Sequence, residues 1–113
     1  MKRLTILGST GSIGRSTLAL VAAAPPGAYG IEVLVAGRDV AGLAAQAREF
    51  GARLAVVADP TGLDALREAL AGSGIEAAAG PEAVIEAAGR PVDWTMAAIV
   101  GAAGLRATLA ALE

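Results

Sequence analysis

The sequence GSTGSIG at residues 8–14 lies between an apolar run at residues 3–7 and a segment whose apolar residues have helical spacing. The first of its glycines, Gly8, lets the chain turn sharply off a strand. The next two, Gly11 and Gly14, let the backbone approach a pyrophosphate and let the helix pack tightly on the strand. A tight turn without a ligand is the alternative. The strand, turn and helix in succession favour a phosphate-binding turn.

Strand-like and helix-like segments alternate along the whole chain. Apolar runs predict strands at residues 3–7, 31–36, 54–57, 75–78 and 93–100. Helical spacing and caps predict helices at residues 13–24, 39–50, 60–70, 81–88 and 105–112. The first helix is expected to turn one stripe inward, formed by Ile13, Thr17, Leu20, Val21 and Ala24. The alternation predicts an α/β fold, a Rossmann-like doubly wound mostly parallel sheet with helices on both faces.

Composition excludes several classes of function. The chain has 113 residues, the size of one domain, with net charge -2 and no cysteine or histidine. Disulfides, Cys/His zinc sites and histidine-based triads are therefore excluded, and nothing points to nucleic acid or a membrane surface. No carboxylate cluster has metal-ligand spacing, and no general acid or base lies near the turn, so we assign no catalytic and no metal residue. With no signal segment or membrane span in the sequence, a cytoplasmic protein is expected.

The carboxyl end of the second predicted strand bears on the choice of dinucleotide. NAD-preferring folds place an acidic residue there, but Glu32 lies at the other end of this strand. Arg38 lies where a guanidinium can pair with a 2′-phosphate, and its alternative is a solvated loop residue. Asp39 is an N-cap candidate whose charge disfavours a neighbouring phosphate. The sequence favours NADPH.

The predicted strand at residues 93–100 ends on the same side of the sheet as the glycine turn. Ala98 and Ile99 near its end are small or apolar, so they can flank a cofactor or belong to an ordinary buried strand. The chain stops at Glu113, after a predicted helix that in such sheets normally leads to another strand, so the strand at 93–100 is expected to present an open edge. We expect either the first part of a longer protein or an edge that pairs with a partner.

Several stretches together resemble the N-terminal region of the 1-deoxy-D-xylulose 5-phosphate reductoisomerase family. They are KRLTILGSTGSIG at residues 2–14, STL at 16–18, LVAGR at 34–38, ADP at 58–60, MAAIVGAAGL at 96–105 and TLAA at 108–111. The glycine turn is shared with many dehydrogenases, whereas its combination with residues 96–105 is specific. The resemblance spans essentially the whole chain.

The resemblance implies an NADPH-dependent oxidoreductase of non-mevalonate isoprenoid biosynthesis. That family rearranges 1-deoxy-D-xylulose 5-phosphate and reduces the product to 2-C-methyl-D-erythritol 4-phosphate, with a divalent metal, Mg or Mn. The residues that match its cofactor-binding positions are Gly8, Thr10, Gly11, Ser12, Ile13, Gly37, Arg38, Asp39, Ala98 and Ile99. The family commonly has an amide where this chain has Asp39.

The family's catalytic, metal-binding and substrate-phosphate residues lie beyond the point where this chain stops. Residues 1–113 are therefore expected to form a dinucleotide-binding domain, truncated before the catalytic domain, that binds NADPH without turnover. The full-length protein is expected to be a homodimer. Two alternatives are a fragment of another NADP-dependent dehydrogenase and a stand-alone nucleotide-sensing module. The only tyrosine, Tyr29, and the absence of cysteine disfavour short-chain and semialdehyde dehydrogenases.

Overall fold

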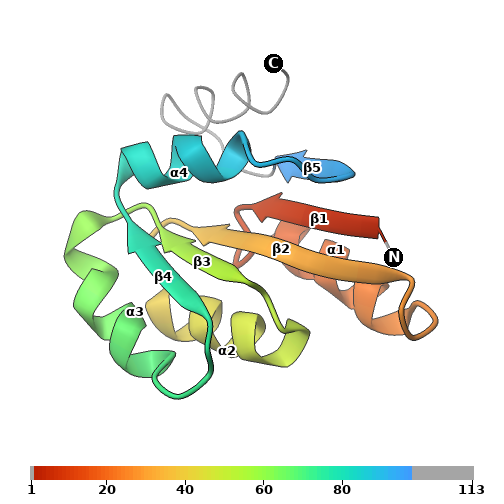
Figure 1. Cartoon of the computed structure of the whole chain (residues 1–113), viewed down its shortest axis with the longest axis horizontal. Helices are drawn as coiled ribbons and strands as arrows, with labels where there is room; N and C mark the ends of the chain where they lie inside the picture. Colours follow the sequence, from red (N-terminus) through yellow and green to blue (C-terminus); the bar gives the residue numbers. More distant parts are fainter. Residues whose placement is uncertain (1, 98–113) are drawn as a thin grey trace.

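The computed structural model of the chain describes residues 2–97. Strands and helices alternate in this part of the chain (Figure 1). In chain order they are β1 (Lys2–Leu7), α1 (Ser12–Ala23), β2 (Tyr29–Ala36), α2 (Val40–Phe50), β3 (Leu54–Val57), a 3-10 turn (Pro60–Gly62), α3 (Leu63–Ala69), β4 (Glu76–Ala79), α4 (Pro81–Ala88) and β5 (Trp94–Ala97). The predicted alternation is confirmed over these residues.

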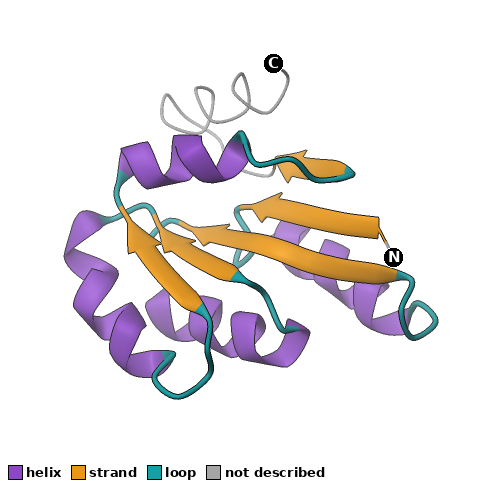
Figure 2. Ribbon diagram, viewed as in Figure 1, coloured by secondary structure: helices purple, strands orange, loops and turns teal. Residues whose placement is uncertain are grey.

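The five strands form one parallel sheet in the order β4-β3-β2-β1-β5. The chain steps outward from β1 to β4, and α4 then carries it back across the sheet to β5, on the far side of β1. Helices α1, α2 and α3 cover one face and α4 covers the other (Figure 2). This is the Rossmann-like, doubly wound α/β fold that the alternation predicts.

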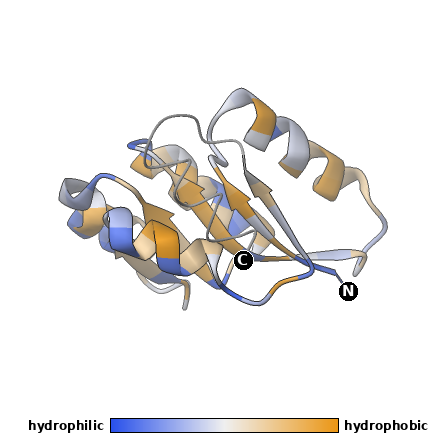
Figure 3. Ribbon diagram, turned by 90° about the horizontal axis from the view of Figure 1, so that it is seen from above, coloured by the Kyte–Doolittle hydropathy of each residue, from blue (hydrophilic) through white to orange (hydrophobic). Residues whose placement is uncertain are grey.

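Two apolar clusters hold the helices to the sheet. Leu18 of α1, Leu43 of α2 and Leu66 of α3 pack with inward strand residues in one cluster. Val84 of α4 packs with Leu7 and other strand residues in the second. Because both faces are covered, β3 and the second half of β2 are apolar throughout, and Figure 3 shows strongly hydrophobic colour in the middle of the sheet.

The inward stripe predicted for the first helix is wrong in part. Ile13 is 61% exposed and Leu20 is 74% exposed, whereas Gly14 and Leu18 are the buried residues of α1. The buried side of α1 is rotated by about one residue from the predicted stripe, because the small residue Gly14 faces inward in place of the larger Ile13. Gly14 lies directly on the backbone of the preceding turn, and this contact decides which side of α1 faces the sheet.

The last part of the chain lies outside the described residues. The predicted strand at 93–100 is present as β5 over Trp94–Ala97, while Ala98, Ile99 and the predicted helix at 105–112 fall beyond the described range. Trp94 contacts Tyr29, with ring centroids 6.2 Å apart, and remains 53% exposed. No helix within residues 2–97 is long and apolar enough to cross a membrane.

Candidate nucleotide-binding site

The glycine turn is hydrogen-bonded to the end of β2 and to the middle of α2. The amides of Gly8 and Ser9 both donate to the carbonyl oxygen of Val35, at 2.7 and 2.9 Å. Gln46 of α2 donates from its side-chain amide to the Ser9 carbonyl oxygen at 2.9 Å. Hydrogen bonds from two elements, β2 and α2, therefore hold the turn in one place, at the carboxyl ends of β1 and β2.

The three glycines of this turn have separable roles. Gly8 has a φ of 92°, a conformation that side chains other than glycine rarely adopt. A Cβ at Gly14 would overlap the Gly8 carbonyl oxygen and would lie 2.6 Å from the Ser9 Cα. A Cβ at Gly11 would make only an ordinary contact, 3.5 Å from the Gly8 oxygen. The protein itself requires glycine at Gly8 and Gly14, whereas at Gly11 it leaves room that a ligand can use.

The start of α1 suits an anion. Gly11 is the N-cap residue and has no side chain to satisfy the first amides of the helix, which have no partner within the helix. The first turn carries no acidic residue, and Ser12 is exposed. Free amides, the helix dipole and nearby hydroxyl groups together favour a phosphate at this position.

Beyond β2, the chain passes through Gly37 and Arg38, both exposed, to the cap of α2. Asp39 accepts a hydrogen bond from the Gly42 amide on Oδ1 at 2.9 Å. Its other oxygen, Oδ2, lies 3.9 Å from Nη2 of Arg15, in the first turns of α1. The N-cap role predicted for Asp39 is confirmed, and its charge is partly compensated by an arginine from another element.

A second aspartate lies at the carboxyl end of β3. Asp59 accepts hydrogen bonds from the Thr61 hydroxyl at 2.7 Å and from the Thr61 amide at 3.0 Å. These hydrogen bonds, with a smaller contribution from the positive charge of Arg38, lower the pKa of Asp59 below its ordinary value. Asp59 is therefore ionised at neutral pH and lies within electrostatic reach of Arg38.

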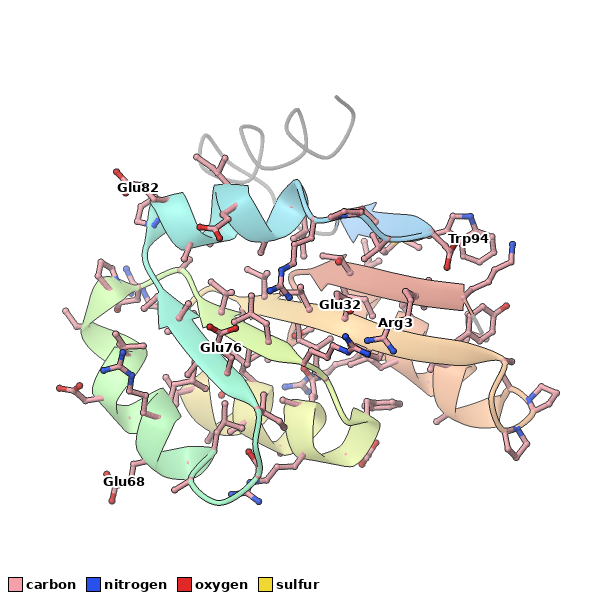
Figure 4. The ribbon with its side chains drawn as sticks, in the orientation of Figure 1. Arg3, Glu32, Glu68, Glu76, Glu82 and Trp94 are labelled. Carbon is pink, nitrogen blue, oxygen red and sulfur yellow. The ribbon has the colours of Figure 1, made fainter. Side chains whose placement is uncertain are left out.

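Glu32 is the fourth of the eight residues of β2, in the middle of the strand rather than at its far end, and arginines hold it there. Its carboxylate lies 2.8 Å from Nη2 of Arg3 and 2.9 Å from Nη1 of Arg90, and Arg53 approaches to 3.8 Å (Figure 4). These partners engage Glu32 far from the glycine turn. The prediction that Glu32 does not serve as a ribose-binding carboxylate fits this placement.

Comparison with known proteins decides the family. The family model described as 1-deoxy-D-xylulose 5-phosphate reductoisomerase matches residues 4–113. The chain belongs to this family. Among reductoisomerases of that name, the one from Rhodopseudomonas palustris (strain BisB18) is 55% identical over 113 residues, and the one from Rhodospirillum centenum (strain ATCC 51521 / SW) is 58% identical over 111 residues. All of this chain matches the first and 98% of it the second, but the chain spans only 28% and 27% of their lengths.

Solved reductoisomerase structures have the same fold. The enzyme from Zymomonas mobilis, in complex with NADPH, matches with a TM-score of 0.95 and 52% identity over 98% of this chain and 29% of that one. A reductoisomerase in complex with NADPH, fosmidomycin and magnesium matches with a TM-score of 0.90 and 39% identity, over 98% of this chain and 28% of its own. The family match excludes the short-chain and semialdehyde dehydrogenase alternatives.

Within this reductoisomerase-family chain, the fold brings most of the predicted site residues to one edge. Residues 8–13 form the turn, and residues 37–39 follow the neighbouring strand. Ala98 and Ile99 lie outside the described residues.

Sequence reasoning missed Gln46 and Arg15, which contact the turn and Asp39 from helices. Arg15 gave a usable signal, a cation one residue after the phosphate turn, whereas nothing local marked Gln46. Residues 2–97 contain no group of acidic side chains that could hold a metal ion.

Proposed function

We propose that this chain is the NADPH-binding domain of a reductoisomerase that converts 1-deoxy-D-xylulose 5-phosphate to 2-C-methyl-D-erythritol 4-phosphate, a step of non-mevalonate isoprenoid biosynthesis. The observation that carries the proposal is the 52% identity, with a TM-score of 0.95, to a reductoisomerase solved with NADPH. The domain comprises residues 1–113. The remaining length of the relatives corresponds to the catalytic part, and the full-length protein is a cytoplasmic homodimer.

The proposed cofactor contacts follow from the geometry of the carboxyl edge. The turn and the first amides of α1 bind the pyrophosphate, with hydroxyl groups from Thr10 and Ser12 and room left by Gly11. Arg38 pairs with the 2′-phosphate, beside Gly37 and Asp39. The proposed cofactor-binding residues are Gly8, Thr10, Gly11, Ser12, Ile13, Gly37, Arg38, Asp39, Ala98 and Ile99.

In this proposal the chain contributes to the reaction by positioning. NADPH supplies the hydride that reduces the aldehyde formed by rearrangement of the sugar-phosphate skeleton. Holding the pyrophosphate and the 2′-phosphate at fixed points orients the dinucleotide across the edge of the sheet. The divalent metal, Mg or Mn, and the groups that act on the substrate belong to the part of the enzyme beyond this chain. The chain alone binds cofactor without turnover.

A titration of the chain with NADPH and, in parallel, NADH tests the proposal through nicotinamide fluorescence or heat of binding. Saturable binding with NADPH preferred is expected. Arg38→Gln should weaken NADPH binding by about tenfold and leave NADH unchanged, since only NADPH carries the 2′-phosphate. Arg67→Gln, at an exposed arginine of α3, is the matched control.

Each other outcome removes a defined part of the proposal. Equal binding of both dinucleotides would keep a dinucleotide site and remove Arg38 as the 2′-phosphate partner. No binding of either at about 1 mM would show that this chain lacks a competent site by itself.

A further inference from the structure

We infer that Arg15 is a specificity-determining residue, which makes the carboxyl end of β2 acceptable to a 2′-phosphate by compensating the charge of Asp39. The inference rests on the proposed function, because it concerns the same NADPH site. It accounts for a conflict in the sequence, where an aspartate directly follows the arginine proposed to bind the phosphate.

Asp39 cannot easily turn its charge away from the site. Its Oδ1 accepts the Gly42 amide at 2.9 Å as the N-cap of α2, and its backbone carbonyl accepts the Leu43 amide at 3.0 Å. The carboxylate also occupies the space that a Cβ of Gly42 would need. The charge is thus fixed at the residue that follows Arg38 in the sequence, and the cation observed near it is Arg15.

Arg15 is placed to supply that compensation. Arg15 lies in α1, the helix that follows the glycine turn, and its amide donates to the Gly11 carbonyl oxygen at 2.9 Å. Its side chain, 66% exposed, extends toward α2, and its Nη2 lies 3.9 Å from Oδ2 of Asp39. Arg15 therefore joins the two segments that the proposed cofactor spans, the turn and the end of β2.

The balance of charge at this edge depends on Arg15. Arg15 pairs with Asp39 and Arg38 acts on Asp59, so the formal charges of these four side chains cancel. Without Arg15 the four positions would carry a net negative charge. A phosphate monoester carries nearly two negative charges at neutral pH, so it would then meet net repulsion. Glu32 does not enter this balance, because its own arginines neutralise it in the middle of β2.

Stabilisation of the fold is a poor explanation for the ion pair between Arg15 and Asp39. Exposed ion pairs at this separation contribute little to folding stability. The cap of α2 is also complete without Arg15, because the Gly42 amide supplies its hydrogen bond. Loss of Arg15 should therefore act mainly on a ligand that brings further negative charge to Asp39.

A double-mutant cycle tests the inference on the 113-residue chain. The dissociation constants of NADPH and NADH are measured for the unmodified chain, Arg15→Gln, Asp39→Asn and the double variant. Arg15→Gln should weaken NADPH binding by about threefold to tenfold and leave NADH within about twofold. Asp39→Asn keeps a good N-cap, should strengthen NADPH binding, and should reduce the effect of Arg15→Gln to below about twofold.

Two further measurements separate charge compensation from a change in structure. Arg15→Lys should restore most of the NADPH affinity, and raising the salt concentration to about 0.5 M should shrink the effect of Arg15→Gln. Arg67→Gln serves as the matched control, with thermal melts confirming that each variant is folded.

The remaining outcomes all overturn the inference. Equal weakening of NADPH and NADH would mean that Arg15 contacts a group common to both, such as the pyrophosphate. No change on Arg15→Gln, with NADPH still preferred by the unmodified chain, would refute the role of Arg15 and leave the proposed function standing. Failure of the unmodified chain to bind either dinucleotide would refute the inference and, of the proposed function, the statement that this chain binds NADPH by itself.

Discussion

Gly11 and Gly14 lie three residues apart in the glycine turn, but the space around their Cα atoms differs. Gly14 contacts the chain's own backbone, because a Cβ there would overlap the Gly8 carbonyl oxygen. Gly11 has extended backbone angles that any residue can adopt, with φ -77° and ψ 172°, and has room for a Cβ. Folding therefore demands the glycine at Gly14 but not the one at Gly11, where the proposed contact with a pyrophosphate gives a separate reason for glycine.

This difference predicts opposite results for two alanine substitutions. Gly14→Ala forces α1 away from the turn and should lower the free energy of unfolding by about 3 kcal/mol. Gly11→Ala should change that free energy by less than about 1 kcal/mol, while it weakens NADPH binding by blocking backbone approach. Urea denaturation and NADPH titration of both variants provide the test. Equal destabilisation by the two would contradict the separation of roles.

Asp59 allows a prediction about pH. Its pKa is lowered by the Thr61 hydroxyl first, then by the Thr61 amide, with a smaller effect from Arg38. A carboxyl with a depressed folded-state pKa stabilises the fold above its unfolded-state pKa, and this contribution disappears as the pH falls through the folded-state value. Thr61→Val should raise the pKa of Asp59 and so reduce this acid-side loss. Arg38→Gln should raise the pKa less. Carboxyl-carbon NMR titration measures both, and the reverse order would count against the assignment of causes.

At the scale of elements, β2 departs from regular pairing where Glu32 lies. Leu4 of β1 pairs with Ile31 and Thr5 pairs with Val33, so Glu32 is the extra residue at this register shift. Its carboxylate, 17% exposed, is the common partner of Arg3, Arg53 and Arg90. The irregularity thus coincides with an ionic cluster that joins β1, β2, the start of β3 and the end of α4.

Glu32→Gln should therefore destabilise the fold. The amide cannot neutralise the surrounding guanidinium groups, so the free energy of unfolding is expected to fall by about 1 to 3 kcal/mol. Glu82→Gln, on the exposed surface of α4 (Figure 4), removes the same charge and should change stability by less than about 0.5 kcal/mol. Equal stability of the two variants in urea denaturation would refute a role for the cluster.

How much could be predicted from the sequence depended on how local each signal was. The ends of α2 were predictable because Asp39 caps its start and Gly51, with a φ of 65°, ends it. The turn at residues 8–14 carries its own pattern. By contrast, Arg90 is 58 residues from Glu32 in the chain, and no local pattern joins them. The pairing of Arg15 with Asp39 likewise requires the relative placement of α1 and α2, which periodicity does not give.

At the scale of the whole molecule, β2 separates the ionic cluster around Glu32 from the charged residues at the nucleotide edge. Glu32 is the fourth of the eight residues of β2, and Arg38 lies two residues beyond the end of this strand. At about 3.3 Å per residue, their backbones are about 20 Å apart, roughly two Debye lengths at physiological salt. Substitutions in one group should leave the other unaffected. The nucleotide edge and the ionic cluster can therefore be tested independently in one chain.

The edge strand β5 carries large apolar side chains that are exposed. Within residues 2–97, β5 pairs only with β1, and it is an edge of the sheet. Trp94 and Met96 pair with Leu4 and Ile6, which share a cluster with α1, so these exposed side chains lie on the α1 face. Leu20 of α1 is exposed as well. An edge strand that residues 2–97 leave unpaired on one side, flanked by large apolar side chains, favours association between chains.

The isolated chain should accordingly self-associate as its concentration rises, measured by sedimentation velocity. Leu20→Gln combined with Met96→Lys should weaken this association, because both changes reduce apolar surface and a lysine on an edge strand opposes pairing. Both side chains are exposed, so thermal stability should stay nearly unchanged. Ala45→Gln combined with Ala65→Lys, at exposed positions of α2 and α3, makes the same types of residue elsewhere. If the chain stays monomeric, or if both double variants associate equally, chains do not associate through this edge.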